Sequence, residues 1–313
     1  MDAHPRQLHQ LEKIVALFAV FAVLALTVGF AQGAGPKKKA KAPVQKVKFV
    51  DEFDRVQAAN PDQIFLRSSS ALVQDASSGE TIFSKNAEAV LPIASITKLM
   101  TAMVVLDRGL ELEDRIVISS DDMDHLKGTH SRLRPGAMLS RNDLLLLALM
   151  ASENRAAAAL ARTYPGGTEA FIAEMNAKAR ALGMQSSRFA DSTGLTPGNV
   201  STAPDLARLV TAAHEYPVIR QFSTRDQAQV QVFGQPLQYH NTNGLVRGQT
   251  WEIGLSKTGF INEAGRCLVM RVRLASKDVV VVLLDSWGKN SRIGDAQRIK
   301  KWLETSTAPR TRG

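Results

Sequence analysis

The chain of 313 residues is 44% apolar and 22% charged, as in an ordinary soluble globular protein, and its length fits one domain of about 250 residues with extensions at both ends. Its net charge is +9, but six lysines in residues 32–50 supply most of that excess, so we expect no nucleic-acid partner. Cys267 is the only cysteine, which excludes an intramolecular disulfide and a cysteine-based metal cluster.

The N-terminus resembles an export signal. Two basic residues precede an apolar run from Ile14 to Phe30, and the small residues Gly29 and Ala31 fit the positions that a signal peptidase reads. We therefore predict a signal peptide over residues 1–31 and a periplasmic location. An uncleaved inner-membrane anchor is the alternative, because the run approaches the roughly 20 residues that span a bilayer. The lysines that follow argue against both, since such clusters usually stay in the cytoplasm.

Three further segments follow from composition. Residues 32–62 form a basic linker rich in Lys, Ala and Pro, residues 63–305 a folded domain, and residues 306–313 a disordered tail. The linker is interpreted as a solvated segment, with weak association with the membrane or an anionic wall polymer as a secondary role. The folded domain is expected to be a monomer.

The first half of the folded domain predicts a hairpin followed by helices. Residues 70–86 predict two short strands around a turn, and a helix is expected from about Ser95 to Asp107. Ser140 is the expected N-cap of a central helix that is apolar on every face. Further predicted segments are a strand at 115–119, a helix resuming after a break at 152–154, and helices at 167–182 and 201–216.

The last third predicts strands. Trp251–Phe260, Arg266–Ala275 and Asp278–Ser286 are joined by short turns, which makes them antiparallel neighbours. The last of these strands is apolar on both faces and therefore central. A final helix, from about Ser291 to Thr305, has one apolar stripe. The order of hairpin, helical block, three strands and helix predicts an α+β fold whose sheet joins both ends of the domain.

Ser95 and Lys98 share one face of the first predicted helix at a spacing of three residues. A serine hydroxyl becomes a strong nucleophile when a base removes its proton, and a neutral lysine can serve as that base. Burial in an apolar helix and a second nearby cation would both lower the pKa of Lys98. The alternative is that Lys98 extends to the surface while Ser95 caps the helix.

Two further motifs support a site. Ser152-Glu153-Asn154 interrupts a helical stretch, and Lys257-Thr258-Gly259 lies inside a predicted strand, where glycine would let a ligand backbone approach. Lys257 would supply the second cation. Either motif alone also fits a plain turn or strand. The six histidines show no metal-binding spacing, so no metal or other cofactor is expected, and His125 and His130 are interpreted as surface residues.

Ser-x-x-Lys, Ser-x-Asn and Lys-Thr-Gly, in this order and in these contexts, form the signature of penicillin-binding proteins and class A β-lactamases. From about residue 70 to 304 the chain resembles the low-molecular-weight D-alanyl-D-alanine peptidases. The runs "LPIASITKLMTAMV", "LMASENRAAAALA", "DSTGL" and "GLSKTGF" are most similar to D-alanyl-D-alanine endopeptidases of the penicillin-binding protein 7 type. The resemblance implies a β-lactamase/transpeptidase-like fold: a five-stranded antiparallel sheet flanked by helices, a mostly helical subdomain, and an active site at their junction.

The resemblance also implies roles for single residues. Ser95 would be the nucleophile and Lys98 its base, and Ser152 would lie beside Lys98 and relay the proton. Substrate would be bound by Asn154, Lys257, Thr258 and Gly259, and the oxyanion hole would be the backbone N–H groups of Ser95 and Phe260. The implied substrates are peptidoglycan peptides, and β-lactams would acylate Ser95.

Two departures refine the expected function. The chain lacks the Glu-x-x-x-Asn loop of class A β-lactamases, since Glu169 and Glu174 lie on an amphipathic helix. Only 54 residues follow Gly259, too few for the second β domain of the common carboxypeptidases. We therefore expect a serine D,D-peptidase that hydrolyses D-alanyl-diaminopimelate cross-links. The alternatives are a carboxypeptidase that trims pentapeptides, weak β-lactamase activity, and a non-catalytic penicillin-binding sensor.

Overall fold

The computed structural model describes residues 63–248 and 250–307. These belong to the compact unit from Val50 to Gly313. The predicted signal peptide (1–31) and linker (32–62), and residues 308–313 of the predicted tail, lie outside the described residues.

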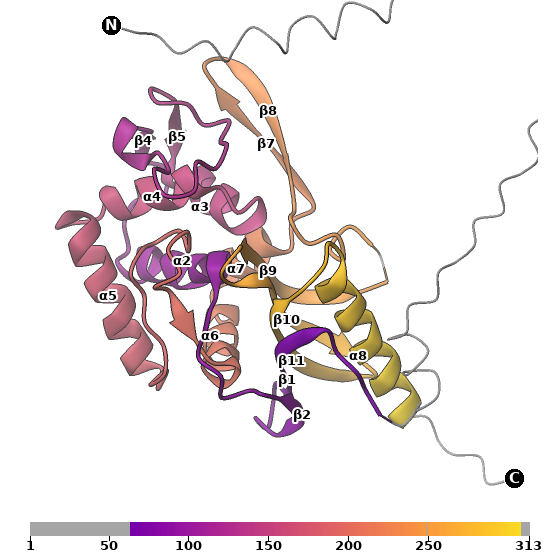
Figure 1. Cartoon of the computed structure of the whole chain (residues 1–313). Coiled ribbons are helices and arrows are strands. Elements are labelled where there is room, and N and C mark those ends of the chain that lie inside the picture. Colours follow the sequence, from indigo (N-terminus) through magenta and orange to yellow (C-terminus); the bar gives the residue numbers. More distant parts are fainter. Residues whose placement is uncertain (1–62, 249, 308–313) are drawn as a thin grey trace, which may run out of the picture. The chain divides into compact units, whose positions relative to one another are not determined.

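A five-stranded antiparallel sheet in the order β2-β1-β11-β10-β9 forms the centre of the fold, as predicted (Figure 1). Both ends of the domain contribute strands: β1 (Ser68–Asp75), β2 (Thr81–Lys85), β9 (Glu252–Ile261), β10 (Gly265–Leu274) and β11 (Lys277–Ser286). The predicted hairpin and the three C-terminal strands are confirmed, and β9 is an edge strand.

The central position predicted for the last strand is also confirmed. In β11, Val279, Val281 and Leu283 face one apolar cluster, whereas the alternating residues Val280, Val282 and Leu284 face the other. Both sets are buried, which is the pattern of a strand covered on two sides.

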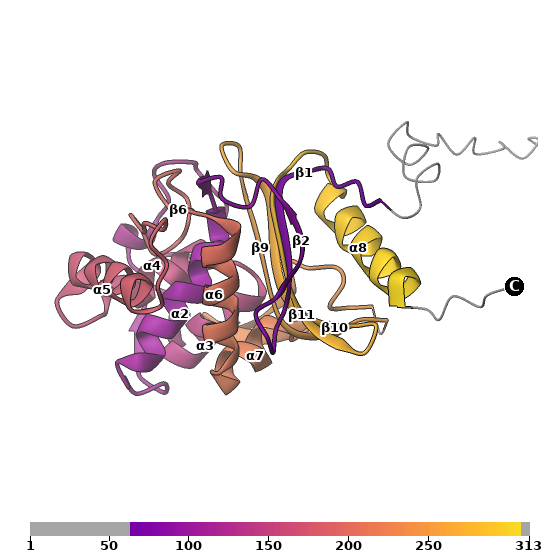
Figure 2. The same cartoon turned by 90° about the horizontal axis from the view of Figure 1, so that it is seen from below.

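Helix α8 (Ser291–Thr307) covers one face of the sheet (Figure 2). Its predicted apolar stripe is confirmed, since Ala296, Ile299 and Leu303 are buried in the cluster beneath it. The carboxylate of Asp295, fully buried, accepts hydrogen bonds from the Ser68 backbone N–H at 2.7 Å and from the Ser68 hydroxyl at 2.6 Å. This carboxylate joins the last helix to the first strand.

The other face of the sheet is covered by a mostly helical subdomain (Figure 2). Its helices are α2 (Lys98–Asp107), α3 (Arg141–Met150), α4 (Asn154–Arg162), α5 (Gly167–Ala181), α6 (Ala203–His214) and α7 (Pro217–Ser223). Ser140 caps α3 as predicted, because its side chain accepts a hydrogen bond from the Asp143 N–H at 3.0 Å. The helix predicted from about Ser95 begins instead with a 3₁₀ turn, η2 (Ala94–Thr97).

Several elements were not predicted. They are α7, the hairpin of β7 (Gln227–Val232) and β8 (Gln235–His240), the short strands β3 (Leu91–Pro92), β5 (Met138–Ser140) and β6 (Val200–Ser201), and the 3₁₀ turn η3 (Ser120–Asp122). The strand predicted at 115–119 is β4 (Arg115–Val117), which pairs with β5. The β7–β8 hairpin projects away from the main sheet beside the β4–β5 region (Figure 1). Within the described part of the chain, the membrane-span criteria of length and hydropathy are met by none of the helices.

Candidate active site

Ser95 lies in the 3₁₀ turn that enters α2, and this turn packs against β9 at the junction between the sheet and the helical subdomain. The preceding residue, Ala94, has a left-handed backbone with φ 48°. Such a conformation is strained for a residue with a side chain, and it persists only where neighbours hold it. The neighbours here are two glycines from distant segments.

Gly194 and Gly259 enclose this turn from two sides. A Cβ on Gly194, whose φ is +82°, would lie 2.0 Å from the Ala94 carbonyl oxygen. A Cβ on Gly259 would lie 2.8 Å from the Ile93 carbonyl oxygen and 3.1 Å from the Ser95 nitrogen. Gly259 lines the cavity beside Ser95, where it was expected to admit a ligand backbone, and it also admits the backbone of the turn carrying Ser95. Glycine at both positions therefore fixes the position of Ser95.

Lys98 is completely buried, so the alternative in which it extends to the surface is wrong. Its Nζ lies 2.8 Å from Ser95 Oγ, 2.7 Å from Asn154 Oδ1 and 2.6 Å from the Thr193 carbonyl oxygen. Burial lowers the pKa of Lys98 to about 7, and the nearby charges of Asp191 and Glu153 oppose that shift. A substantial fraction of Lys98 is therefore neutral near neutral pH.

The three partners of Lys98 decide what the neutral amine can do. The carbonyl oxygens of Thr193 and Asn154 can only accept hydrogen bonds, so they take both N–H groups of a neutral amine. The remaining lone pair is directed at Ser95 Oγ, whose proton it can accept. This arrangement prepares a serine for nucleophilic attack.

The Thr193 carbonyl was not predicted as part of the site. Its loop is shaped by Asp191, whose carboxylate accepts hydrogen bonds from the N–H groups of Thr193 at 2.6 Å, Gly194 at 2.5 Å and Thr196 at 2.9 Å. Asp191, Thr193 and Gly194 belong to the run "DSTGL", which carried part of the family resemblance. That run was the available signal, although it could not identify the carbonyl itself.

Ser152 also has a left-handed backbone, with φ 59°, in the break between α3 and α4. Its Oγ accepts a hydrogen bond from Lys257 Nζ at 2.9 Å, a partner that the sequence did not indicate. No hydrogen bond joins Ser152 to Lys98 among the described residues. Lys257 on β9 is 1% exposed, and burial, with smaller contributions from the charges of Lys98 and Arg292, lowers its pKa well below the ordinary lysine value.

The two buried lysines lie in the same site, as expected. Burial is the main cause of the lowered pKa at both Lys98 and Lys257. Repulsion between the two ammonium groups adds to the effect of burial at Lys257, so the site disfavours protonation of both amines together.

Asn154 and Thr258 meet further residues that the sequence did not single out. Asn154 Nδ2 donates to Thr129 Oγ1 at 3.1 Å, so its amide is held between Thr129 and Lys98. The Thr258 and Thr242 hydroxyl oxygens lie 2.6 Å apart. Thr129 and Thr242 lie in loops that are separate in the sequence from all three motifs, and no residue pattern pointed to them.

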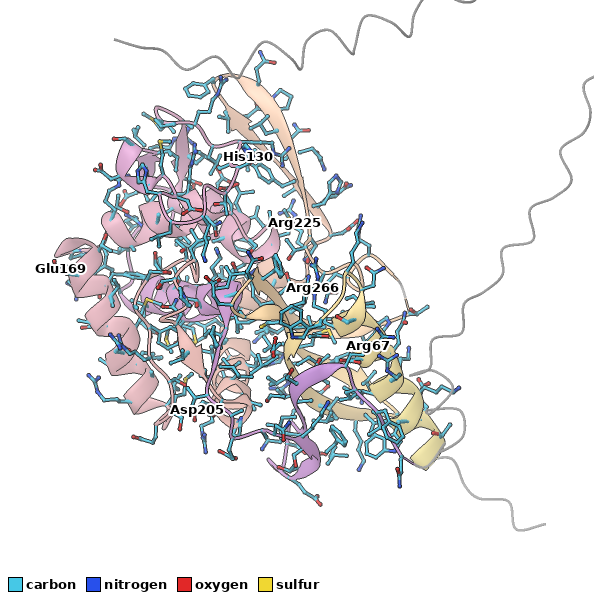
Figure 3. All side chains as sticks on the ribbon, in the orientation of Figure 1. Arg67, His130, Glu169, Asp205, Arg225 and Arg266 are labelled. Carbon is cyan, nitrogen blue, oxygen red and sulfur yellow. The ribbon has the colours of Figure 1, made fainter. Side chains whose placement is uncertain are left out.

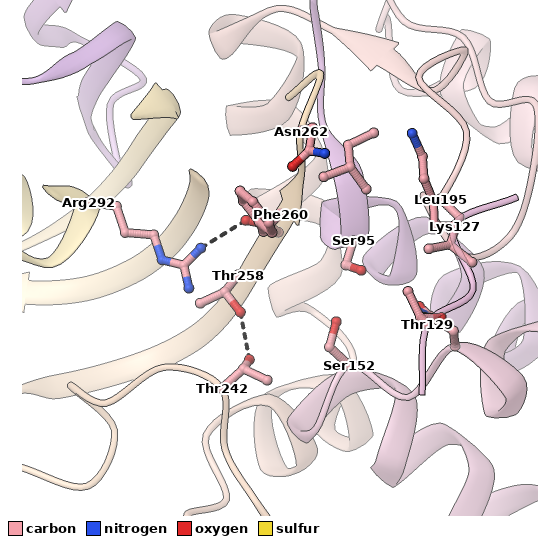
Figure 4. Close-up of a pocket in the computed structure, with 13 residues that line it drawn as sticks. Ser95, Lys127, Thr129, Ser152, Leu195, Thr242, Thr258, Phe260, Asn262 and Arg292 are labelled. Atoms are coloured by element: carbon pink, nitrogen blue, oxygen red, sulfur yellow. Dashed lines mark hydrogen bonds between the residues drawn. The ribbon is translucent and has the colours of Figure 1, made fainter. Parts of the chain in front are cut away.

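A cavity of about 390 Å³ opens beside these groups, and Ser95, Ser152, Asn154, Thr258 and Gly259 all line it. In the close-up, Ser95 and Ser152 point into the same space, with Thr258 on the sheet side (Figure 4). Phe260 also lines the cavity and is half exposed. Arg292 completes the sheet side, where its guanidinium donates to the Gly259 carbonyl at 2.8 Å.

The N–H groups expected to form the oxyanion hole are suitably placed in the chain. The Ser95 N–H belongs to the first turn of its helix, where backbone N–H groups lack intrahelical acceptors. Phe260 lies on the edge strand β9, directly after the glycine that touches the Ser95 turn. Both residues line the cavity.

The remaining candidate residues lie elsewhere. His125 and His130 are exposed, as predicted, and His130 lies toward the β7–β8 hairpin (Figure 3). Glu169 is exposed on α5, far from the sheet (Figure 3). Cys267 is packed inside β10, and burial raises the pKa of its thiol to about 11, so it is a structural residue.

The sequence and the structure were compared with known proteins. The model of the D-alanyl-D-alanine carboxypeptidase family, Peptidase S11, matches residues 55–288. A D-alanyl-D-alanine endopeptidase of Pseudomonas aeruginosa is 46% identical over 94% of this chain and 89% of its own length. A second protein of that name, from Escherichia coli, is 47% identical over 79% of this chain and 81% of its length.

Among solved structures, the crystal structure of a Streptomyces DD-transpeptidase superposes with a TM-score of 0.72 at 26% identity. The match covers 78% of this chain and 99% of the transpeptidase. A D-alanyl-D-alanine carboxypeptidase from Mycobacterium tuberculosis gives a TM-score of 0.70 at 25% identity, over 79% of this chain and 94% of its own. The arrangement of sheet, helical subdomain and intervening site is therefore the one found in these enzymes.

Proposed function

The chain belongs to the D-alanyl-D-alanine carboxypeptidase family of serine peptidases, and we propose that it hydrolyses D-alanyl-diaminopimelate cross-links of peptidoglycan through an acyl-enzyme on Ser95. One observation carries the proposal: the buried Lys98 Nζ lies within hydrogen-bond distance of Ser95 Oγ and of two carbonyl oxygens. In its neutral form the amine can therefore donate to both carbonyls and accept the proton of Ser95. The high identity to proteins named endopeptidases supports the choice of the cross-link as substrate.

In the acylation step, Ser95 Oγ attacks the carbonyl carbon of the D-alanine residue while its proton moves to Lys98. The oxygen of the tetrahedral intermediate accepts hydrogen bonds from the N–H groups of Ser95 and Phe260. When the amide bond breaks, Lys98 gives up the proton from Ser95 through Ser152, whose hydroxyl takes it and passes its own proton to the leaving amine. The amine departs as the free amino group of diaminopimelate, and Lys98 is neutral again. The hydrogen bond from Lys257 holds Ser152 at the cavity wall for this relay.

In the second step, water releases the acyl group. Lys98, neutral again, removes a proton from the water, which attacks the ester on Ser95 and restores the free serine. β-Lactams acylate Ser95 in the same way, because their strained amide takes the place of the D-alanine amide. We also propose that Asn154, Lys257, Thr258 and Gly259 bind the substrate, with Lys257 and Thr258 facing its carboxylate.

The substrate proposal is tested with purified protein and two peptidoglycan fragments. Cross-linked muropeptide dimers should be converted to monomers, whereas monomeric pentapeptide should be trimmed slowly or not at all. A Ser95→Ala protein should be inactive on both. Trimming of the pentapeptide alone would instead establish the carboxypeptidase alternative. Covalent labelling by penicillin without turnover of either peptide would establish the sensor alternative.

We further propose that the chain is exported and acts in the periplasm, where its substrate lies. The apolar run at Ile14 to Phe30 supports this proposal. The mass of the mature protein isolated from cells distinguishes a cleaved signal from a retained anchor. A mature chain that still carries residue 1 in a cytoplasmic fraction would exclude export.

A further inference from the structure

An ion pair lies at one end of the active-site cavity. Lys127 lines the cavity, and its Nζ contacts the carboxylate of Glu263 in the turn between β9 and β10. In the close-up, Lys127 and Asn262 lie beyond Ser95 at one end of the cavity, whereas Thr242 and Ser152 lie at the other (Figure 4). The pair thus connects the helical side of the site to the sheet side.

The loop that carries Lys127 is built to hold its position. The Asp124 carboxylate accepts hydrogen bonds at 2.9 Å from the backbone N–H groups of Leu126, Lys127 and Thr129. Thr129 in turn accepts a hydrogen bond from Asn154, the residue that binds Lys98. The Lys127 ammonium therefore has a defined position relative to the catalytic groups.

The direction of the bound substrate follows from the roles proposed above, on which this inference rests. The carboxylate of the leaving group faces Lys257 and Thr258, and the scissile carbonyl faces the Phe260 N–H. A peptide extended along the edge strand β9 must then run with its acyl-donor part past Phe260 toward Asn262. The residue that precedes the scissile D-alanine consequently arrives at the Lys127 end of the cavity.

Charge at this end favours an acidic group. The charged side chains that line the cavity are Lys127 and Arg292, both cations. Arg292 is committed to the carbonyl oxygens of Gly259 and Cys267. The side chains of Lys127 and Glu263 are 27% and 40% exposed, and pairs this accessible contribute little stability. An incoming carboxylate can therefore replace Glu263 at small cost.

We propose that Lys127 is a specificity-determining residue that binds a carboxylate on the residue preceding the scissile D-alanine, and that Glu263 occupies this position in the free enzyme. In a D-alanyl-diaminopimelate cross-link the preceding residue is itself a diaminopimelate, whose side chain ends in an amino group and a carboxylate. The enzyme accordingly selects donor peptides in which this carboxylate is free over those in which it is amidated.

The test compares two muropeptide dimers that differ in this one group, a free carboxylate or a carboxamide. The wild-type protein should cleave the free-carboxylate dimer with a kcat/KM about tenfold higher, the usual effect of one charge-assisted hydrogen bond. Lys127→Met should reduce this preference to less than about twofold. Glu263→Gln should keep the preference and lower KM for the free-carboxylate dimer, because the competing carboxylate is gone.

Lys277→Met is the matched control, since Lys277 is exposed at the start of β11, at the opposite end of the strands from Glu263. It should behave like the wild type. The inference is overturned if Lys127→Met keeps the full preference for the free-carboxylate dimer. It is also overturned if Lys127→Met and Glu263→Gln slow the cleavage of both dimers equally, because the Lys127–Glu263 ion pair then has only a structural role. Labelling of Ser95 by fluorescent penicillin should be detectable in every variant, which shows that each variant folds. A wild-type protein that takes up penicillin but cleaves neither dimer would overturn the proposed function and, with it, this inference.

Discussion

The protonation state of Lys98 should control acylation, and pH is the perturbation that tests it. The pKa of this buried amine is about 7, against 10.5 for an ordinary lysine. The neutral fraction should therefore be about one in eleven at pH 6 and about ten in eleven at pH 8. Since only the neutral amine accepts the Ser95 proton, the acylation rate should rise about tenfold over this interval and level off above it.

A charge-neutralising variant should move this pH profile in a known direction. The carboxylate of Glu153 raises the pKa of Lys98, so Glu153→Gln should lower that pKa and shift the rising limb toward lower pH. Glutamine keeps a side-chain oxygen for the Arg155 N–H that Glu153 now caps at 3.3 Å. The start of α4 should therefore be preserved, and the change should be electrostatic.

The assay is the second-order rate of acylation by a fluorescent penicillin, measured from about pH 5 to pH 9. Lys98→Arg should show no acylation at any pH in this range, because a guanidinium stays protonated. A rate that is flat across this range, or one that still rises about tenfold per pH unit at pH 9, as expected for a base with the ordinary lysine pKa of 10.5, would refute the assignment of Lys98 as the base. A shift of the Glu153→Gln profile toward higher pH would refute the electrostatic argument.

Three other predictions follow from buried groups. Lys98 binds a proton in the unfolded protein, whereas burial disfavours that proton in the folded protein. The free energy of unfolding of the wild type, relative to that of Lys98→Met, should therefore fall by about 4 kcal/mol as the pH falls from 10.5 to about 7. Urea unfolding measures this difference, and a difference that stays constant with pH would contradict the burial argument. Gly194→Ala should cost more than about 3 kcal/mol and abolish penicillin labelling, because its Cβ meets the Ala94 carbonyl oxygen. Gly183→Ala, also at positive φ but in open space, should cost about 1 kcal/mol and label normally; equal losses would show that backbone conformation alone matters. The Cys267 thiol should not react with a disulfide reagent until the protein is unfolded, and fast reaction of the native protein would show that β10 opens.

Most of the sheet could be predicted because its signals are local. The apolar run of β11 indicated a central strand, and Ser140 indicated the start of α3. The β7–β8 hairpin had a signal too, since Ala228, Val230 and Val232 alternate with exposed glutamines. That alternation was overlooked because the segment is polar overall and does not belong to the main sheet.

The site could be predicted only as far as it depends on residue types. Serine and lysine three residues apart indicate a nucleophile and its base wherever they fold together. The Thr193 carbonyl that helps to orient Lys98 is a backbone group, which every residue possesses, so no residue pattern can identify it. Likewise, Ser152 meets Lys257 because β9 passes the break between α3 and α4, and the tertiary fold sets the distance between these two side chains.

The topology of the sheet delays folding until synthesis is nearly complete. The first strand pairs with the central strand β11, so Ser68 cannot pair with Ser286 until the ribosome has added about 200 more residues. At the usual rate of about 5–20 residues per second, the ribosome needs roughly 10–40 s to supply that partner. During this interval β1 and β2 form at most an isolated hairpin, which is marginally stable in water. The export proposed above would need an unfolded chain, and this arrangement would give it time, because β11, which completes the core, is the last strand in the described part of the chain.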